Sequence, residues 1–217
     1  MTETQTRTVA DLMERAGHTF AEDAGITLKD EPKPLFQLLV LTLLLSARIS
    51  ADIATHAARE LFRSGWRTPQ ALASAPRQDV IAALKRGHYS RYDETRATEL
   101  RLAAERVERE YHGDVRRLAE ACDGDPGGAA AALEEFDGIG PVGADIFLRE
   151  VQDLWPWLKP HMDARVLRGA DELHLPHEGE WLADMAPGGR VAPLAAALVR
   201  VTLDKDLRAD VLAARGS

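Results

Sequence analysis

The chain has 217 residues, of which 45% are hydrophobic, enough for one substantial core or two smaller lobes. A total of 27 Lys and Arg residues against 35 Asp and Glu residues gives a formal net charge of -8, which excludes a protein whose whole surface attracts nucleic acid. The single cysteine, Cys122, excludes an intramolecular disulfide framework and a metal centre held by several thiolates of this chain. We expect neither a cofactor nor a catalytic metal.

The sequence also lacks the signals of membrane insertion and export. No window approaches the roughly 18 uninterrupted apolar residues of a membrane span, and the first residues lack the basic start and apolar block of a signal peptide. We therefore expect a cytoplasmic protein without a membrane partner.

Helical signals dominate the chain. Apolar residues recur at spacings of three and four, and no long alternating run of Val, Ile and Thr occurs, which predicts an all-α fold. A first helix is expected over 8–25, followed by a loop over 29–34 in which two prolines break the helical pattern. Residues 36–47 are apolar nearly all round, which predicts a helix buried at the centre of the fold.

Start and stop signals divide the rest of the chain. Ser and Thr caps and helix-ending glycines predict helices over 50–62, 68–75, 75–87 and 93–113. The segment 122–130, rich in Gly and Asp, is expected to be a loop. A helix is expected to start within 161–176, and a strongly apolar helix follows a Pro-Gly-Gly break further on.

One local basic cluster interrupts the acidic composition. The stretch "LKRGHYSRY" contains Lys85, Arg86, His88 and Arg91 with no acid between them. It is either a contact for nucleic acid or a solvated helix end.

The stretch "LEEFDGIGPVGADIFL", residues 133–148, carries two glycines one residue apart between two short apolar helical patterns. Gly138 and Gly140 can adopt positive φ and expose backbone amides, which together with the following helix N-terminus form a site for a phosphate oxygen. This spacing, with the small Ala144 in register, is that of the helix-hairpin-helix DNA-binding motif, and its predicted DNA contacts are Gly138, Ile139, Gly140 and Gly143. Backbone amides bind phosphate without a cationic side chain, so the acidic net charge is a weaker objection. The alternative is a plain turn between core helices.

Four segments between about Pro34 and His174 resemble, in order, those of the helix-hairpin-helix (HhH-GPD) DNA glycosylases, the superfamily of endonuclease III, adenine glycosylase and the alkylpurine glycosylases. The segments are "FQLLVLTLLLSARIS", "LKRGHYSRYDETRATEL", "FDGIGPVGADIF" and "KPHMDARVLRGA". The expected fold has two helical lobes, with one domain over 34–158 that ends in the hairpin, and a second domain formed by 1–33 and 159–217.

The resemblance assigns roles to individual residues. Asp163 corresponds to the essential carboxylate, Arg48 to the residue that fills the space left by an extruded base, and His88 to a second such position. Without the resemblance, Asp163 is the cap of the following helix and Arg48 is an exposed helix-end cation, and for Asp163 the two roles can coexist. Because cleavage of an N-glycosidic bond builds positive charge on the sugar, a carboxylate fixed beside it stabilises the transition state.

Two departures from the family refine the expected activity. Members that also cut the strand carry a hairpin lysine at the position of Val142, and valine cannot form a Schiff base. Members of the endonuclease III and adenine glycosylase types hold an iron-sulfur cluster with four cysteines near the end of the chain, which are missing here. In alkylpurine glycosylases, the position of Val142 holds a tryptophan that stacks on the damaged base.

We therefore expect a monofunctional DNA glycosylase that acts as a monomer on duplex DNA with a damaged base, in the cytoplasm at the nucleoid. Another lysine, first of all Lys159, is the remaining route to strand cleavage. The alternative function is a non-catalytic helix-hairpin-helix protein that binds distorted or damaged DNA. The candidates for the base pocket are Val142, Ile146, Tyr89, Trp155 and His161. Hinge packing is the alternative for Trp155 and its neighbour Trp157, and an exposed loop position is the alternative for His161.

Overall fold

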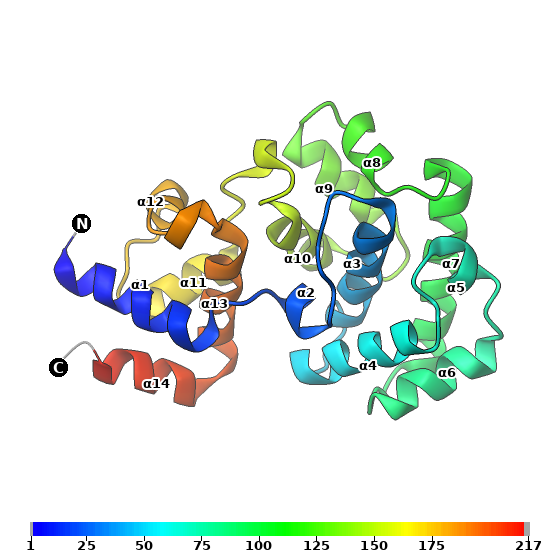
Figure 1. Ribbon diagram of the computed structural model, residues 1–217, viewed down its shortest axis with the longest axis horizontal. Helices are drawn as coiled ribbons and strands as arrows, with labels where there is room; N and C mark the ends of the chain where they lie inside the picture. Colours follow the sequence, from blue (N-terminus) through cyan, green and yellow to red (C-terminus); the bar gives the residue numbers. More distant parts are fainter. Residues whose placement is uncertain (1, 215–217) are drawn as a thin grey trace. The chain divides into compact units, whose positions relative to one another are not determined.

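The computed structural model describes residues 2–214 and contains α-helices, two short 3-10 helices and no strand within that range (Figure 1). The all-α class expected from the sequence is confirmed. No helix among the described residues is both long enough and apolar enough to cross a membrane.

The chain folds as two compact units. Unit 2 is continuous, from Phe20 to Phe147, and unit 1 combines the described residues up to Thr19 with those from Leu148 onward. The helix α10 (Pro141–Val151) begins in unit 2 and ends in unit 1. The division into helical domains at 34 and 158 that the sequence led us to expect stays a prediction.

Unit 2 is built around α3 (Pro32–Leu45), in which every residue from Pro34 to Leu44 is buried. Its other helices are α2 (Phe20–Asp23), α4 (Ala51–Arg63), α5 (Pro69–Ala73), α6 (Arg77–Arg86), α7 (Asp93–Tyr111), α8 (Arg116–Ala121) and α9 (Pro126–Glu134). Of these, α4 and α7 pack against α3. The predicted helix over 36–47 is thus the centre of unit 2.

Three boundaries differ from the sequence predictions. The prolines predicted to break the helix lie in the first turn of α3. Amides of the first turn have no acceptor within the helix, so the missing amide hydrogen of proline costs no hydrogen bond there. The predicted loop 122–130 contains the start of α9, because the Asp125 carboxylate accepts the amides of Gly127 and Gly128 and caps the helix. The first helix, α1 (Glu3–Ala16), stops before Gly17, where a Cβ would lie 2.3 Å from the Met13 carbonyl oxygen.

Unit 1 is built around α13 (Val191–Leu203), which is buried along most of its length. The helices α1, α11 (Ala164–Glu172) and α14 (Lys205–Ala214) pack against it (Figure 1). A Cβ at Gly169 would lie 2.0 Å from the Leu198 carbonyl oxygen, so the backbones of α11 and α13 touch there. The remaining elements are α12 (Gly179–Asp184) and the 3-10 helices Pro156–Leu158 and Pro187–Gly189.

Candidate functional site

The Gly-x-Gly stretch forms a tight turn between α9 and α10. Gly138 has a φ of 89°, a conformation that favours glycine, and both Gly138 and Gly140 are exposed. Among the described residues no hydrogen bond engages the amides of these two glycines, which leaves them available to a ligand. Ile139 differs, because its side chain is buried and its amide donates to the Phe136 carbonyl at 2.9 Å. The prediction that the Ile139 amide contacts DNA is therefore replaced by a structural role in the turn.

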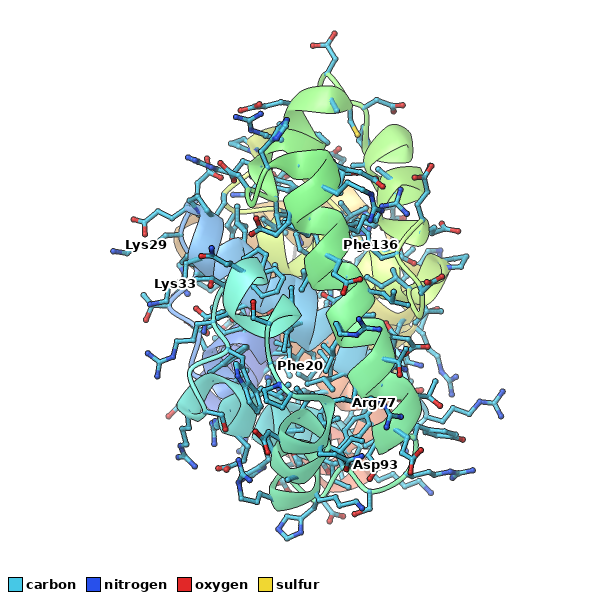
Figure 2. All side chains as sticks on the ribbon, turned by 90° about the vertical axis from the view of Figure 1, so that its right-hand side faces the viewer. Phe20, Lys29, Lys33, Arg77, Asp93 and Phe136 are labelled. Atoms are coloured by element: carbon cyan, nitrogen blue, oxygen red, sulfur yellow. The ribbon has the colours of Figure 1, made fainter. Side chains whose placement is uncertain are left out.

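Helix α7 supports the hairpin at two points. A Cβ at Gly138 would lie 2.7 Å from both Arg96 Nη1 and Glu99 Oε2, so the turn rests directly on these side chains. Further along α7, Arg106 contacts the carbonyl and carboxylate of Glu135 and lies 5.2 Å from the centre of the Phe136 ring. Figure 2 faces α7, with Phe136 beside its later turns and Asp93 at its start. The hairpin is thus held by a helix as well as by its own turn geometry.

The C-terminal end of α3 brings this hairpin together with two other loops. A Cβ at Gly143 would lie 2.5 Å from Ser46 Oγ, so α3 and the first turn of α10 are in direct contact. In the loop between α6 and α7, the Tyr89 hydroxyl donates to the Leu44 carbonyl at 3.3 Å. The loop 47–50, which carries Arg48, follows directly. Three loops of unit 2 therefore converge around one helix end.

The two proposed gap-filling residues are accessible on this surface. Arg48 and His88 are exposed, and no ion pair or side-chain hydrogen bond of either occurs within residues 2–214. His88 adopts a φ of 63° and Tyr92 a φ of 68°, and between these two turns the chain directs Tyr89 inward. Tyr89 is fully buried, so the prediction that it faces a base pocket is wrong.

The other cations of the basic cluster have partners nearby. Lys85 lies 3.5 Å from an Asp93 carboxylate oxygen, and Arg86 Nε lies 3.2 Å from a Glu60 carboxylate oxygen. The Arg91 guanidinium lies over the Tyr92 ring, 5.0 Å from its centre. All three are exposed, so contact with DNA stays a prediction for them, with their charge partly offset.

In unit 1, Asp163 caps α11 and is paired with a buried arginine. Its Oδ1 accepts the amides of Arg165 and Val166, at 2.8 and 3.2 Å. Its Oδ2 accepts from Nη1 of Arg149, and both side chains are only 4% exposed. The carboxylate is thus fixed by three N–H donors, one of which carries a full positive charge.

The segment before Asp163 is held by residues near the end of α10. Gln152 is fully buried, and its amide group accepts from the His161 backbone N–H at 2.9 Å and donates to the His161 carbonyl at 3.3 Å. Asp153 lies 2.6 Å from Lys159 Nζ, which also donates to the Gly189 carbonyl. The sequence reasoning missed Arg149 and Gln152. The sequence does contain a signal for these two residues, because they are long polar residues, three positions apart, at the end of an otherwise apolar helical pattern.

The remaining base-pocket candidates divide by exposure. Val142 is 61% exposed at the hairpin, as an accessible contact requires. Ile146 and Trp155 are buried, and Trp155 stacks on Trp157 with ring centres 5.8 Å apart. The prediction of Trp155 and Ile146 as base contacts is therefore corrected to packing. His161 is half-buried, with its backbone bound by Gln152.

Comparisons with known proteins identify the fold. No protein-family model and no curated protein matches this chain. Among solved structures, a trapped covalent intermediate of endonuclease III with DNA, an estranged-adenine complex, matches with a TM-score of 0.53 and 15% identity. A non-covalent endonuclease III–DNA complex matches with a TM-score of 0.55 and 16% identity. Each match covers 92% of this chain and 85% of the other, so nearly the whole chain has the helical fold of endonuclease III.

Proposed function

We propose that this chain is a monofunctional DNA glycosylase, which hydrolyses the N-glycosidic bond of a damaged base extruded from duplex DNA. The observation that carries the proposal is the Asp163 carboxylate, fixed by the α11 amides and by Arg149 in a chain with the endonuclease III fold. The protein acts as a monomer, in the cytoplasm at the nucleoid.

Duplex DNA binds first through its backbone. The exposed amides of Gly138 and Gly140 donate to a phosphate oxygen, which positions the duplex without reading its sequence. Arg48 and His88 enter the space that the extruded nucleotide leaves, which offsets part of the cost of unstacking. Their exposure, and the lack of a side-chain partner for either within residues 2–214, support this role.

The reaction then breaks the bond between C1′ of the sugar and the base nitrogen. The bonding electron pair leaves with the base, positive charge develops on the sugar, and the ionised carboxylate of Asp163 stabilises it. Water supplies the hydroxyl group that C1′ gains, and its proton is released to the base or to solvent. An abasic site and a free base result.

Water is the nucleophile in this proposal because neither the hairpin position nor Lys159 offers an unbound amine. Val142 occupies the hairpin position that a lysine holds in strand-cutting relatives. Lys159, the lysine nearest to Asp163 in the sequence, is bound to Asp153 and to the Gly189 carbonyl.

A second candidate is a non-catalytic protein that recognises distorted or damaged DNA. The exposed Val142 favours it, since valine offers no aromatic surface to a damaged base.

The two candidates are separated by release of free base from duplexes that carry alkylated, oxidised or deaminated bases. The wild type is expected to release base from at least one of them, and Asp163→Asn to be slower by about 100-fold or more. Asp171→Asn, which alters an exposed carboxylate of the same helix, is the matched control and should match the wild type. Borohydride should trap no covalent complex.

The opposite outcome is equally specific. If neither the wild type nor Asp163→Asn releases base from any lesion, yet both bind bent or damaged duplexes, the protein is a binding module. A borohydride-trapped complex that disappears in Lys159→Gln would instead show lyase chemistry.

A further inference from the structure

A buried ion pair lies directly beneath the hairpin. On α7, Arg96 Nη1 is 2.8 Å from Glu99 Oε2, and their side chains are 9% and 19% exposed. The exposed Gly138 covers them so closely that a Cβ there would lie 2.7 Å from both atoms. The backbone that is proposed to hold phosphate therefore rests on two charges.

The pair is incompletely satisfied. The distance between Nη1 and Oε2 is short, but the two groups are not aligned as a hydrogen bond. These two atoms and Arg96 Nε are buried without a hydrogen-bond partner within the described chain. Buried polar atoms without a hydrogen-bond partner are rare in native proteins and lower their stability. A contribution to the stability of the fold therefore does not explain this pair.

The charged and titratable groups around Glu99 come from three elements. Arg96 lies on the same helix, Asp137 belongs to the turn, and the Tyr89 hydroxyl of the α6–α7 loop lies beside Arg96. Burial raises the pKa of Glu99, the nearby Asp137 raises it further, and Arg96 acts in the opposite direction. The guanidinium of an arginine, by contrast, stays charged at all relevant pH values.

We propose that Arg96 and Glu99 set the phosphate affinity of the hairpin. Arg96 supplies positive charge behind the glycine amides, and Glu99 offsets that charge as long as it is ionised. This inference rests on the proposed contact between the hairpin and DNA, and it does not require base excision.

Two consequences follow from the direction of the charges. Replacement of Glu99 by glutamine keeps the shape of the side chain and leaves the Arg96 charge uncompensated, so phosphate binds more tightly. A unit charge removed at about 8–10 Å changes affinity on the order of three- to tenfold at low salt. Because the pKa of Glu99 is raised, affinity also increases as pH falls, before exposed carboxylates begin to take up protons.

The experiment measures the dissociation constant of a labelled undamaged duplex between pH 5 and pH 8 at constant ionic strength. All proteins carry His88→Gln, which removes an exposed histidine from the same surface. Glu99→Gln is compared with the matched control Glu105→Gln, which removes a partly exposed carboxylate of α7 that pairs with Arg101.

Glu99→Gln is expected to bind about three- to tenfold more tightly near pH 8 and to lose most of the pH dependence. Glu105→Gln is expected to keep the pH dependence of the His88→Gln protein, which is the parent of all the variants. Asp137→Asn provides a second test at an exposed position, and it should move the midpoint of the pH dependence to lower pH. Thermal unfolding of each variant establishes that it is folded. If Glu99→Gln is not folded, the comparison between the pH dependence of the parent and that of Asp137→Asn decides the test.

The results distinguish this inference from the proposed function. Two results refute the role of the Arg96–Glu99 pair while the glycosylase proposal stands. In the first, the His88→Gln parent binds the duplex and Glu99→Gln behaves like Glu105→Gln. In the second, Asp137→Asn leaves the midpoint of the pH dependence unchanged. If the wild-type protein binds no duplex at all, both proposals fail.

Discussion

Asp163 is bound more extensively than a helix cap requires. A capping carboxylate needs one oxygen on the first-turn amides, and Oδ1 alone does this here. The other oxygen faces the buried Arg149, although burial of an ion pair costs desolvation that the pairing seldom repays in full. The arrangement indicates that Arg149 fixes the direction of the second oxygen, and we regard it as a positioning residue for Asp163.

Replacement of Arg149 by glutamine should therefore lower the single-turnover rate of base release by about tenfold or more, with little change in duplex affinity. In the Asp163→Asn background the same replacement should have no further effect, because the two residues act as one unit. Arg168→Gln, which breaks an exposed pair with Glu172 on α11, is the control. Equal losses in both backgrounds would mean that Arg149 serves stability alone.

At the scale of elements, the contact between α3 and α10 depends on a residue without a side chain. Gly143 is buried against Ser46, whereas Gly140, three residues earlier, is exposed and has no atom within 4 Å of the position of a Cβ. The two glycines of one motif thus have separate tasks. Gly143 packs two helices, and Gly140 presents its amide.

Alanine at each position should separate these tasks. Gly143→Ala should lower the free energy of unfolding by about 1–3 kcal/mol, because the added methyl group overlaps Ser46 Oγ, which must then leave its hydrogen bond to the Thr42 carbonyl. Gly140→Ala should leave stability almost unchanged but weaken duplex binding, since its methyl group would lie where phosphate approaches. Denaturant unfolding and duplex titration measure the two effects, and a wild-type stability for Gly143→Ala would contradict the close contact.

At the scale of the whole molecule, a net charge of -8 restricts how the protein can bind DNA. Binding must rely on a few local contacts, chiefly amides and the exposed Arg48, and cannot come from an extended basic surface. The pairing of Lys85 and Arg86 with acids reduces the positive charge further.

We therefore expect the logarithm of affinity to fall with the logarithm of salt concentration with a shallow slope, equivalent to roughly two to four phosphates. Titrations between about 50 and 200 mM salt measure it. A flat line would contradict phosphate contact, and a slope near that of a broadly basic protein would require cationic contacts beyond this surface.

Much of this organisation follows from local sequence signals. The caps, prolines and glycines predicted most helices, the hairpin and the position of Asp163 at a helix start, because these depend on neighbouring residues. The roles of Arg149 and of the Arg96–Glu99 pair could not be predicted, since they depend on contacts with residues that are distant in the sequence. Tyr89 and Trp155 were misassigned for the same reason: proximity to basic or catalytic residues in the sequence does not reveal which way a side chain turns.

The discontinuity of unit 1 has a consequence for synthesis. Unit 2 is one continuous segment and contains α2 to α9 in full, so it can fold while the remainder of the chain is still being made. The helix α1 is made before unit 2 but packs on α13 and α14, and α13 in turn takes its N-terminal cap from Asp153, 38 positions earlier. Until α13 and α14 leave the ribosome, the apolar residues of α1 lack the two helices on which they pack, so a nascent chain stalled before residue 191 should be the form most dependent on chaperones.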